Sequence, residues 1–321
     1  MKPLLLILDD WEGRIQASTC WSLVGRLVDI RFLPQPLDKT TDSEIEAARF
    51  IMAMRERTIL NEQVFQRMPN LRLILQTGGH AYHIDKAAAQ KRNIQVALGR
   101  QVTAPLNSVP ELTFAFALGL IHQVNQANSA MHNDQWQPFT GRTLANRRMG
   151  ILGLGRHGMR VAQIASTAFK MEVVAWERTP TTENTPHPFK RISLDELLET
   201  SDVVSIHLRL SEESTGLLNK ERLGRMKPGS ILINTSRGAI VDEKALTEVL
   251  TTGPLAGAGL DVFVEEPLAA NSPLRKLDNV ILTPHIGWTV EEVFDEFAQI
   301  ACRQLKEYIT GTLDPSELIS H

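Results

Sequence analysis

The chain has 321 residues, enough for two domains of ordinary size, and its 43% hydrophobic and 22% charged content is typical of a globular protein. A formal net charge of −3 argues against a nucleic-acid or membrane surface, and no apolar run approaches the length of a membrane span. Cys20 and Cys302 lie far apart in sequence and do not make a disulfide framework, so a reducing cytoplasm is the simplest setting.

Short apolar runs alternate with helical patterns in the first part of the chain. The run 4–8 is too short for a secretory signal and is followed at once by two aspartates, so we interpret it as a buried strand. Alternation of strands and helices predicts a parallel sheet covered on both faces. The predicted strands are 4–8, 28–33, a run centred on Ile51, 71–76 and 95–98, and the helical stretches between them include 43–49 and 84–92.

A loop over residues 99–110 precedes a long helix. Ser108 and Glu111 have the spacing of a capping box, and Pro110 then falls in the first turn, where its missing N–H does no harm. The nearly continuous apolar run 112–121 predicts that this helix is buried and bridges two domains.

The polar stretch 125–145 contains two isolated large apolar side chains, Trp136 and Phe139. Two interpretations are open. The rings pack locally beneath a loop, or the stretch is an arm that buries them in a partner subunit.

The strand–helix rhythm returns in the second half, with predicted strands at 148–152, 172–176, 202–207, 230–234, 256–260 and 279–283. Six such strands suit a doubly wound nucleotide-binding domain. A final amphipathic helix at about 290–310 is expected to cross back and pack near the first domain.

The glycines 153, 155 and 158 follow the strand 148–152 with the spacing G-x-G-x-x-G. Gly153 allows a sharp turn, Gly155 lets the backbone approach a pyrophosphate, and Gly158 lets the next helix pack close to the strand. Glu177 follows the next strand, where an acidic residue would hold an adenosine ribose. This pattern predicts a dinucleotide site on a helix N-terminus.

Three other predicted strands end in polar side chains: Arg237 after one, Asp261, Glu265 and Glu266 after the next, and His285 after the last. Each alone is compatible with a solvated charge, an ordinary turn or a capped side chain. Because ligands of an open α/β sheet collect at the carboxyl ends of its strands, we expect these groups to share the crevice of the glycine turn.

Read in order, these motifs resemble those of the D-isomer-specific 2-hydroxyacid dehydrogenases over nearly the whole chain. The matching stretches are 141–158, 202–219, 226–246, 256–268 and 279–288, and 7–10 and 77–85 fit the first domain of some members. The resemblance implies an α/β fold of two doubly wound parallel-sheet domains and a homodimer. A Rossmann domain over 104–289 would be inserted into a flavodoxin-like substrate domain built from 1–103 and 290–321.

The resemblance also implies catalytic roles. Arg237 would bind the substrate carboxylate and polarise the keto oxygen through separate guanidinium donors. His285 would be the general acid, and Glu266, which directly precedes Pro267, would hydrogen-bond and orient its imidazole. Backbone amides of Gly79 and His80 would hold the other side of the carboxylate.

For the cofactor, the resemblance implies that Arg156 and His157 meet the pyrophosphate and Asp261 the nicotinamide amide, with Thr235 and Ser236 forming a wall. The full set implied to bind cofactor is Gly153, Gly155, Arg156, His157, Gly158, Glu177, Arg178, His207, Thr235, Ser236, Asp261 and Gly287. No histidine spacing indicates a metal site.

Glu177 favours NAD, because a carboxylate accepts hydrogen bonds from the ribose 2′-hydroxyl and repels a 2′-phosphate. NADP is the alternative, since Arg178 and Thr179 follow at once and offer partners for that phosphate.

The activity that the resemblance implies is reversible reduction of a small 2-keto acid to its D-2-hydroxy acid. Glyoxylate and hydroxypyruvate are the first substrates to test. Gln76 lies where phosphoglycerate-type members place an arginine, which disfavours a phosphorylated substrate. The alternatives are a dinucleotide-sensing, corepressor-like binding protein of the same fold and another reaction such as formate oxidation.

Overall fold

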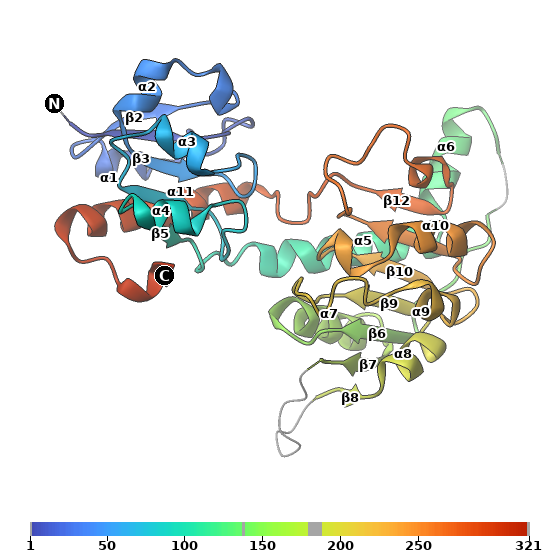
Figure 1. The fold of residues 1–321 in the computed structure, drawn as a ribbon. Coiled ribbons are helices and arrows are strands. Elements are labelled where there is room, and N and C mark those ends of the chain that lie inside the picture. The colour runs from blue at the N-terminus through green and yellow to red at the C-terminus, as the bar shows by residue number, and fades with distance from the viewer. Residues whose placement is uncertain (1, 137–138, 179–187, 320–321) are drawn as a thin grey trace. The chain divides into compact units, whose positions relative to one another are not determined.

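The computed structural model describes residues 2–136, 139–178 and 188–319, and the chain divides into two compact units (Figure 1). Unit 1 consists of Met1–Ala104 together with Thr289–His321, and unit 2 is Pro105–Trp288. Unit 1 is therefore assembled from both ends of the chain, and unit 2 is inserted between them in sequence.

Unit 1 is built on a five-stranded sheet in the order β2-β1-β3-β4-β5, in which every pair is parallel. This is the strand order of flavodoxin-like folds. The five predicted strands are confirmed, with the bounds β1 Leu4–Ile7, β2 Asp29–Phe32, β3 Ala48–Ala53, β4 Leu73–Gln76 and β5 Gln95–Leu98. The helices of residues 2–104 are α1 Trp21–Val24, α2 Asp42–Ala47, α3 Glu62–Gln66 and α4 Lys86–Lys91, with a 3-10 turn η1 at Leu37–Lys39. The predicted helical stretch 43–49 is wrong at its end, because β3 already begins at Ala48.

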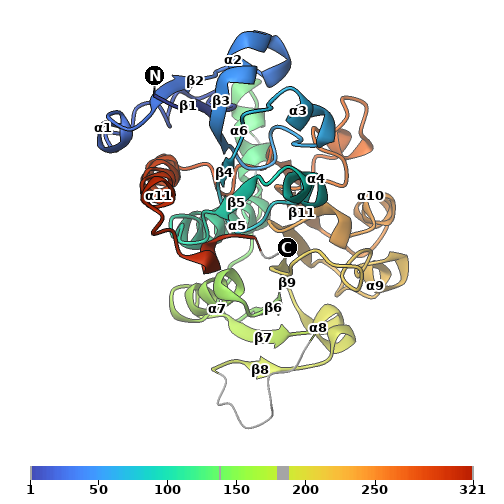
Figure 2. The same cartoon turned by 60° about the vertical axis from the view of Figure 1, so that its left-hand side comes forward.

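Helix α11, Glu291–Thr310, packs against β4 and α1 of unit 1 (Figure 2). The ring of Tyr308 lies edge-on to Phe50 of β3, with 5.9 Å between centroids. The helix ends at Gly311, whose positive φ of 73° is typical of a helix C-terminus. Beyond the 3-10 turn η4 at Pro315–Glu317, Leu318 bridges to Ala97 of β5. The expectation that the last helix crosses back to the first sheet is confirmed.

Unit 2 is built on a seven-stranded parallel sheet in the order β12-β11-β10-β9-β6-β7-β8. The six predicted strands are confirmed. The bounds are β6 Arg148–Leu152, β7 Glu172–Trp176, β8 Lys190–Arg191, β9 Val203–Ile206, β10 Ile231–Asn234, β11 Gly257–Leu260 and β12 Val280–Leu282. The seventh strand, β8, was missed because two residues are too short to carry an apolar period.

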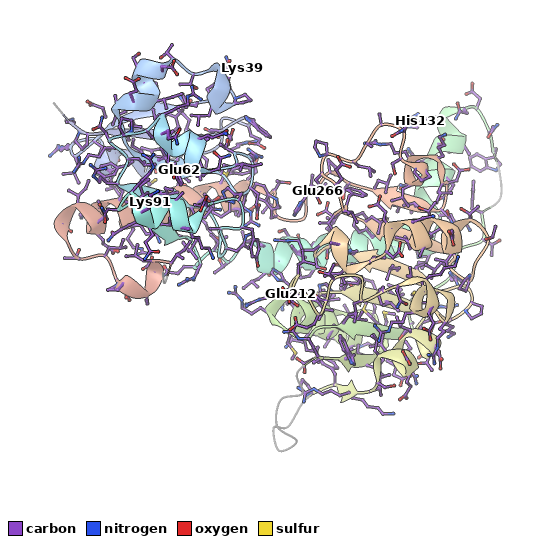
Figure 3. The ribbon with its side chains drawn as sticks, viewed as in Figure 1. Lys39, Glu62, Lys91, His132, Glu212 and Glu266 are labelled. Carbon is purple, nitrogen blue, oxygen red and sulfur yellow. The ribbon has the colours of Figure 1, made fainter. Side chains whose placement is uncertain are left out.

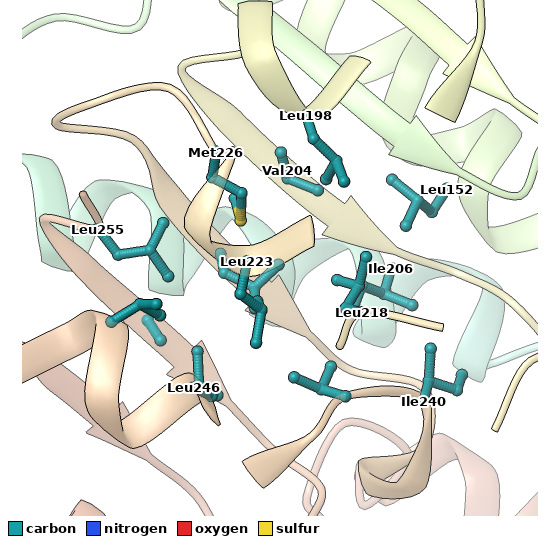
Figure 4. Close-up of a cluster of buried hydrophobic side chains, with 14 of the residues drawn as sticks. Leu152, Leu198, Val204, Ile206, Leu218, Leu223, Met226, Ile240, Leu246 and Leu255 are labelled. Carbon is teal, nitrogen blue, oxygen red and sulfur yellow. The ribbon is translucent and has the colours of Figure 1, made fainter. Parts of the chain in front are cut away.

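Alternate residues of the central strands of unit 2 serve two cores on opposite faces of the sheet. Leu232 of β10 packs with the apolar side of α8–α10, the core drawn in Figure 4. Its neighbours Ile231 and Ile233 pack with α5 and α7. Burial on both faces explains the continuous apolar strands of this sequence. The helices are α5 Pro105–Ile121, α6 Val124–His132, α7 Arg156–Thr167, α8 Leu194–Thr200, α9 Lys220–Gly224 and α10 Glu243–Thr251, with 3-10 turns η2 Gly238–Ile240 and η3 Pro273–Lys276.

Two sequence interpretations need correction. The predicted capping box at Ser108 is wrong, because α5 already begins at Pro105, and the Ser108 hydroxyl donates to the carbonyl of Gly287 at 2.7 Å. Proline at a first helical position loses no hydrogen bond, which explains the earlier start. Local packing of Trp136 is also wrong, since that side chain is 90% exposed, whereas Phe139 is half-buried.

Among the described residues, none of the helices combines the length and the apolar character that crossing a membrane requires.

Candidate active site

The glycine turn that joins β6 to α7 has the geometry that the sequence pattern requires. Gly153 has φ +96°, and a Cβ there would lie 2.9 Å from the carbonyl oxygen of His207. A Cβ on Gly158 would lie 1.9 Å from the carbonyl oxygen of Gly153, so only glycine allows this approach of helix and strand. Gly155 is the N-cap of α7, and a Cβ on it would meet no atom within 4 Å. The backbone thus faces open space at a helix N-terminus, which fits a pyrophosphate.

Two histidines lie beside this turn, and both are held neutral. Burial lowers the pKa of His157, and so does the charge of Arg156, although a hydrogen bond to the Pro105 backbone opposes them. Burial lowers the pKa of His207 to about 3, and its Nε2 lies 2.8 Å from the Ser205 hydroxyl. Of the residues predicted to meet the pyrophosphate, Arg156 therefore brings the positive charge.

The residues that follow β7 already have partners. Glu177 Oε2 lies 2.8 Å from a guanidinium nitrogen of Arg191 on β8. Arg178 donates to the Ser211 hydroxyl at 2.7 Å and to Glu213 at 3.0 Å. Thr179 lies outside the described residues. Arg178 would have to leave both partners to hold a phosphate.

Asn234, the last residue of β10, shapes the turn that carries Arg237. Its buried side chain accepts hydrogen bonds from the backbone and hydroxyl of Ser236, at 3.0 and 2.9 Å, and donates to the Arg237 carbonyl at 2.9 Å. The Thr235 hydroxyl lies 3.4 Å from that of Thr113 on α5. Asn234 was not predicted from the sequence, although a polar residue at the end of an apolar strand was a usable signal.

The turn after β10 is in direct contact with the loop after β11. A Cβ on Gly238 would lie 2.0 Å from the carbonyl carbon of Phe263, so glycine is required where the two loops meet. This close contact brings Arg237 near enough to Glu266 for its charge to act on that carboxylate.

Glu266 and His285 form a hydrogen-bonded pair across the ends of β11 and β12. Glu266, labelled in Figure 3, accepts from the Phe263 amide through Oε1 at 3.0 Å, and its Oε2 lies 2.7 Å from Nδ1 of His285. Burial acts to raise the pKa of Glu266, but the hydrogen bond and charge of His285, the Phe263 amide and Arg237 together lower it. The carboxylate is therefore ionised at neutral pH, and Nε2 is the imidazole nitrogen left to exchange a proton with a substrate.

The backbone of His285 has φ +56°, a left-handed conformation that costs free energy in a residue with a side chain. Asp261 holds this segment in place. Its buried carboxylate accepts from the Thr283 hydroxyl at 2.5 Å and from the amides of Ile286 and Gly287, each at 2.8 Å. Burial raises the pKa of Asp261, although these hydrogen bonds act in the opposite direction. Asp261 thus fixes the chain on both sides of His285, a set of contacts that the sequence did not reveal.

Gly79 and His80 belong to unit 1 and lie on the loop after β4. Nδ1 of His80 is 3.0 Å from Glu56, and its ring stacks on Tyr82 with 4.8 Å between centroids. Gln76, at the end of β4, is buried and donates to the Thr77 carbonyl at 2.9 Å.

In the described parts of both units, no group of three or more His, Cys, Asp or Glu side chains is placed to hold a metal ion.

A doubly wound sheet with a glycine-rich turn at one strand end and a His–Glu pair at two others is typical of a nicotinamide-dependent oxidoreductase. Residues 114–287 match the family of the D-isomer specific 2-hydroxyacid dehydrogenase NAD binding domain. The chain belongs to the D-isomer-specific 2-hydroxyacid dehydrogenase family.

Individual relatives agree with this family assignment. The chain is 31% identical over 315 residues to a hydroxypyruvate reductase of Blautia hydrogenotrophica, covering 94% of this chain and 93% of the relative. It is 37% identical over 265 residues to a glyoxylate reductase of Thermofilum pendens, covering 80% of this chain and 77% of the relative. A D-lactate dehydrogenase of Aquifex aeolicus, solved with NAD and lactic acid, superposes with a TM-score of 0.80 at 27% identity and 96% coverage of both chains. The chain is an NAD-binding enzyme that transfers a hydride to or from C2 of a 2-keto or 2-hydroxy acid.

Proposed function

We propose that this enzyme reduces a small, unphosphorylated 2-keto acid, with glyoxylate and hydroxypyruvate as the first candidates, to the D-2-hydroxy acid. The observation that carries this proposal is the 2.7 Å contact between Nδ1 of His285 and the carboxylate of Glu266. An imidazole oriented in this way is a general acid for a carbonyl oxygen. The names of the hydroxypyruvate and glyoxylate reductases among the relatives support the choice of substrate.

In this proposal Arg237 binds the substrate carboxylate and polarises the keto oxygen. A planar guanidinium can do both through separate N–H donors, which the ammonium of lysine cannot reproduce. Asn234 supports this role, because it fixes the Arg237 carbonyl and the preceding serine. The amides of Gly79 and His80 are proposed to take the other side of the carboxylate.

His285 delivers the proton from Nε2 to the carbonyl oxygen, and the ionised Glu266 stabilises the positive imidazole before transfer. The reduced nicotinamide, when bound, supplies the hydride to C2. Asp261 keeps the His285 segment in its left-handed conformation, and its proposed contact with the nicotinamide amide stays a prediction. In the oxidation direction the neutral imidazole accepts the proton from the 2-hydroxyl.

NAD is the proposed cofactor in preference to NADP. The carboxylate of Glu177 at the end of β7 would accept hydrogen bonds from the ribose hydroxyls and would repel a 2′-phosphate. The hydrogen bonds of Arg178 to Ser211 and Glu213 support this choice, because they must break before Arg178 can hold a phosphate. Arg156 and the N-terminus of α7 are proposed to contact the pyrophosphate. The residues proposed to line the rest of the cofactor site are His157, His207, Thr235, Ser236 and Gly287.

We also propose a cytoplasmic homodimer that does not bind nucleic acid. The exposed apolar side chains on and after α6 support a role in a dimer contact, Trp136 at 90% and Met131 at 56% exposure. The net charge of −3 supports the absence of a nucleic-acid partner.

One panel tests this proposal: steady-state reduction of glyoxylate, hydroxypyruvate, pyruvate and phosphohydroxypyruvate, each with NADH and with NADPH. We expect turnover of the small keto acids with NADH. Binding of NADH without turnover of any keto acid would instead identify a dinucleotide-sensing binding protein. An NADPH preference of about tenfold or more, a difference of ~1.4 kcal/mol, would overturn the cofactor assignment.

A further inference from the structure

The two cysteines of the chain lie side by side in unit 1, although their positions differ by 282 in sequence. Their Sγ atoms are 2.9 Å apart, and both thiols are free. A disulfide bond is about 2.0 Å long, so the two sulfurs need to approach by only about 0.9 Å to bond. Both side chains are buried, Cys20 at 7% and Cys302 at 1% exposure.

Besides the cysteine pair, two polar contacts link the segment 14–20 to helix α11. Arg14 pairs with Glu291 at 2.9 Å, and the hydroxyl of Ser18 donates to Asp295 at 2.5 Å. The helix residues of the three links, at 291, 295 and 302, recur at helical spacing and so lie along one side of α11. The two neighbouring links hold Cys20 in register with Cys302. Unit 1 is built from two separate chain segments, and this is where its N-terminal segment meets the C-terminal helix.

We propose that Cys20 and Cys302 form a site of reversible oxidation, at which a small-molecule disulfide of the glutathione class converts the two thiols to an intramolecular disulfide. The inference goes beyond the proposed function and does not depend on it.

Cys20 is the attacking thiol. A hydrogen bond from the Cys302 thiol lowers the pKa of Cys20, although burial and the negative charge of Asp295 act against this. The same pairing, together with burial, raises the pKa of Cys302. Thiol–disulfide exchange requires a thiolate, so reaction begins at the sulfur with the lower pKa. Cys20 is also the less buried of the two, at 7% exposure against 1% for Cys302.

The thiol–disulfide exchange takes place in two steps. The Cys20 thiolate attacks one sulfur of oxidised glutathione and forms a mixed disulfide, and the released glutathione thiolate takes up the proton that Cys20 lost. The Cys302 thiol then loses its proton, attacks the Cys20 sulfur and releases the second glutathione, which takes up that proton. Two cysteine thiols are oxidised to one disulfide, and one oxidised glutathione is reduced to two thiols.

The disulfide would join the two chain segments of unit 1 covalently. It would also close a long loop that contains the whole of unit 2. In the chain-entropy description, a cross-link over so long a loop restricts the unfolded chain strongly and raises stability. Oxidation is therefore expected to raise the temperature of thermal unfolding of unit 1.

The test uses the full-length wild-type protein in buffers of graded oxidised-to-reduced glutathione ratio, with N-ethylmaleimide added to trap free thiols. Intact mass and peptide mapping should show a loss of both alkylatable thiols, no retained glutathione and a cross-linked peptide pair containing Cys20 and Cys302. Dithiothreitol should restore both thiols. Two alkylatable thiols at every ratio, or glutathione adducts without the cross-linked pair, would overturn the proposal.

Two variants separate the roles of the sulfurs. Cys302→Ser should keep a stable glutathione adduct on Cys20, because no second thiol resolves it, whereas Cys20→Ser should stay unmodified in the native state. The reverse pattern would overturn the assignment of Cys20 as the attacking thiol. Oxidised wild type should unfold at a higher temperature than reduced wild type, and neither variant should show that difference. If a serine variant does not fold, the wild-type mass and unfolding measurements still decide between the outcomes.

Discussion

Nδ1 of His285 lies 2.7 Å from one oxygen of Glu266, and the other oxygen of that carboxylate accepts a hydrogen bond from the Phe263 amide. The backbone amide thus holds one oxygen of the carboxylate and leaves the other to the imidazole. Its orientation is set by a backbone atom of the loop after β11, and the orientation of the imidazole follows from it. This arrangement keeps Nδ1 occupied and assigns proton transfer to Nε2.

The His285→Ala variant tests the general acid. Loss of a positioned acid typically costs about two to four orders of magnitude in rate, so kcat for 2-keto-acid reduction should fall by about a hundredfold or more. NADH binding, followed by fluorescence titration, should change little. Near-normal turnover would show that His285 is not the acid.

The Glu266→Gln variant separates the charge of this residue from its hydrogen bond. Glutamine can still accept from Nδ1–H, but it removes the negative charge that favours the protonated imidazole. We expect kcat to fall by roughly tenfold or more, with a smaller change in the keto-acid KM. An unchanged kcat would mean that Glu266 serves only to fold the loop.

The pKa of Glu266 also makes a prediction about stability. The folded protein holds that pKa below its ordinary value of 4.5, so the ionised carboxylate contributes stability above that pH and loses it as the pH falls through the folded value. The difference in unfolding temperature between wild type and Glu266→Gln should therefore be full at pH 7 and shrink toward zero in acid. Thermal unfolding by circular dichroism from pH 7 down to about pH 3 measures it. A difference that grows in acid would contradict the sign.

Asp261→Asn should affect activity through the position of His285. Asparagine has one acceptor oxygen in place of two, so it cannot keep the hydrogen bonds from Thr283, Ile286 and Gly287 together. We expect kcat to fall by about tenfold or more, because a catalytic group displaced by about 1 Å loses much of its effect.

A matched control for Asp261→Asn is Asp202→Asn. Asp202 precedes β9, at the opposite end of the strands, and pairs with Lys227 at 2.8 Å and Arg147 at 3.2 Å. Its substitution should lower the unfolding temperature while leaving kcat and KM close to wild type. Equal losses of kcat in the two variants would mean that Asp261 acts through general stability and not through His285.

The sequence was sufficient to predict most of the fold. Most of its strands are short apolar runs that are buried on both faces, and such runs can be recognised without knowing which strands they pair with. The glycine turn could be predicted from its spacing as well, although the close approach of Gly153 to the His207 carbonyl is visible only in the structure. Strand β8, with only Lys190 and Arg191, carries no period and was missed.

The rest depends on contacts between distant segments. Ser108 has the spacing of a capping box, but the carbonyl of Gly287 binds its hydroxyl instead. Asp261 could be given a role toward a cofactor from sequence, but not its hold on the residues after His285. Both chain ends were expected to build one unit, but the contact between Cys20 and Cys302 depends on which side of α11 faces the segment 14–20.

Gly155→Ala tests the proposed pyrophosphate site without disturbing the fold. A Cβ there meets no protein atom within 4 Å, so the variant should unfold at nearly the wild-type temperature. The methyl group would occupy the space proposed for the pyrophosphate, and the Kd for NADH should rise by about tenfold or more. Isothermal titration calorimetry measures the Kd. Unchanged NADH binding would place the pyrophosphate elsewhere.

Gly224→Ala is the control for that substitution. Gly224 ends helix α9, is exposed, and also has open space around a Cβ. Alanine should therefore stabilise the protein slightly, by at most about 0.5–1 kcal/mol, and leave NADH binding unchanged. A weakened NADH affinity in this variant would show that the effect at Gly155 is not specific to the turn.

Glu177→Gln tests the cofactor preference. In the wild type, Arg191 lies 2.8 Å from the Glu177 carboxylate, so the two charges offset one another at the end of β7. Removing the carboxylate charge leaves Arg191 without that compensation, and a 2′-phosphate then meets its positive charge. The ratio of kcat/KM for NADPH to that for NADH should rise by about tenfold, equivalent to ~1.4 kcal/mol. Steady-state kinetics with one keto acid and both cofactors measures it, and Arg191→Gln should move the ratio in the opposite direction. A ratio that neither substitution changes would show that the adenosine ribose does not bind at the end of β7.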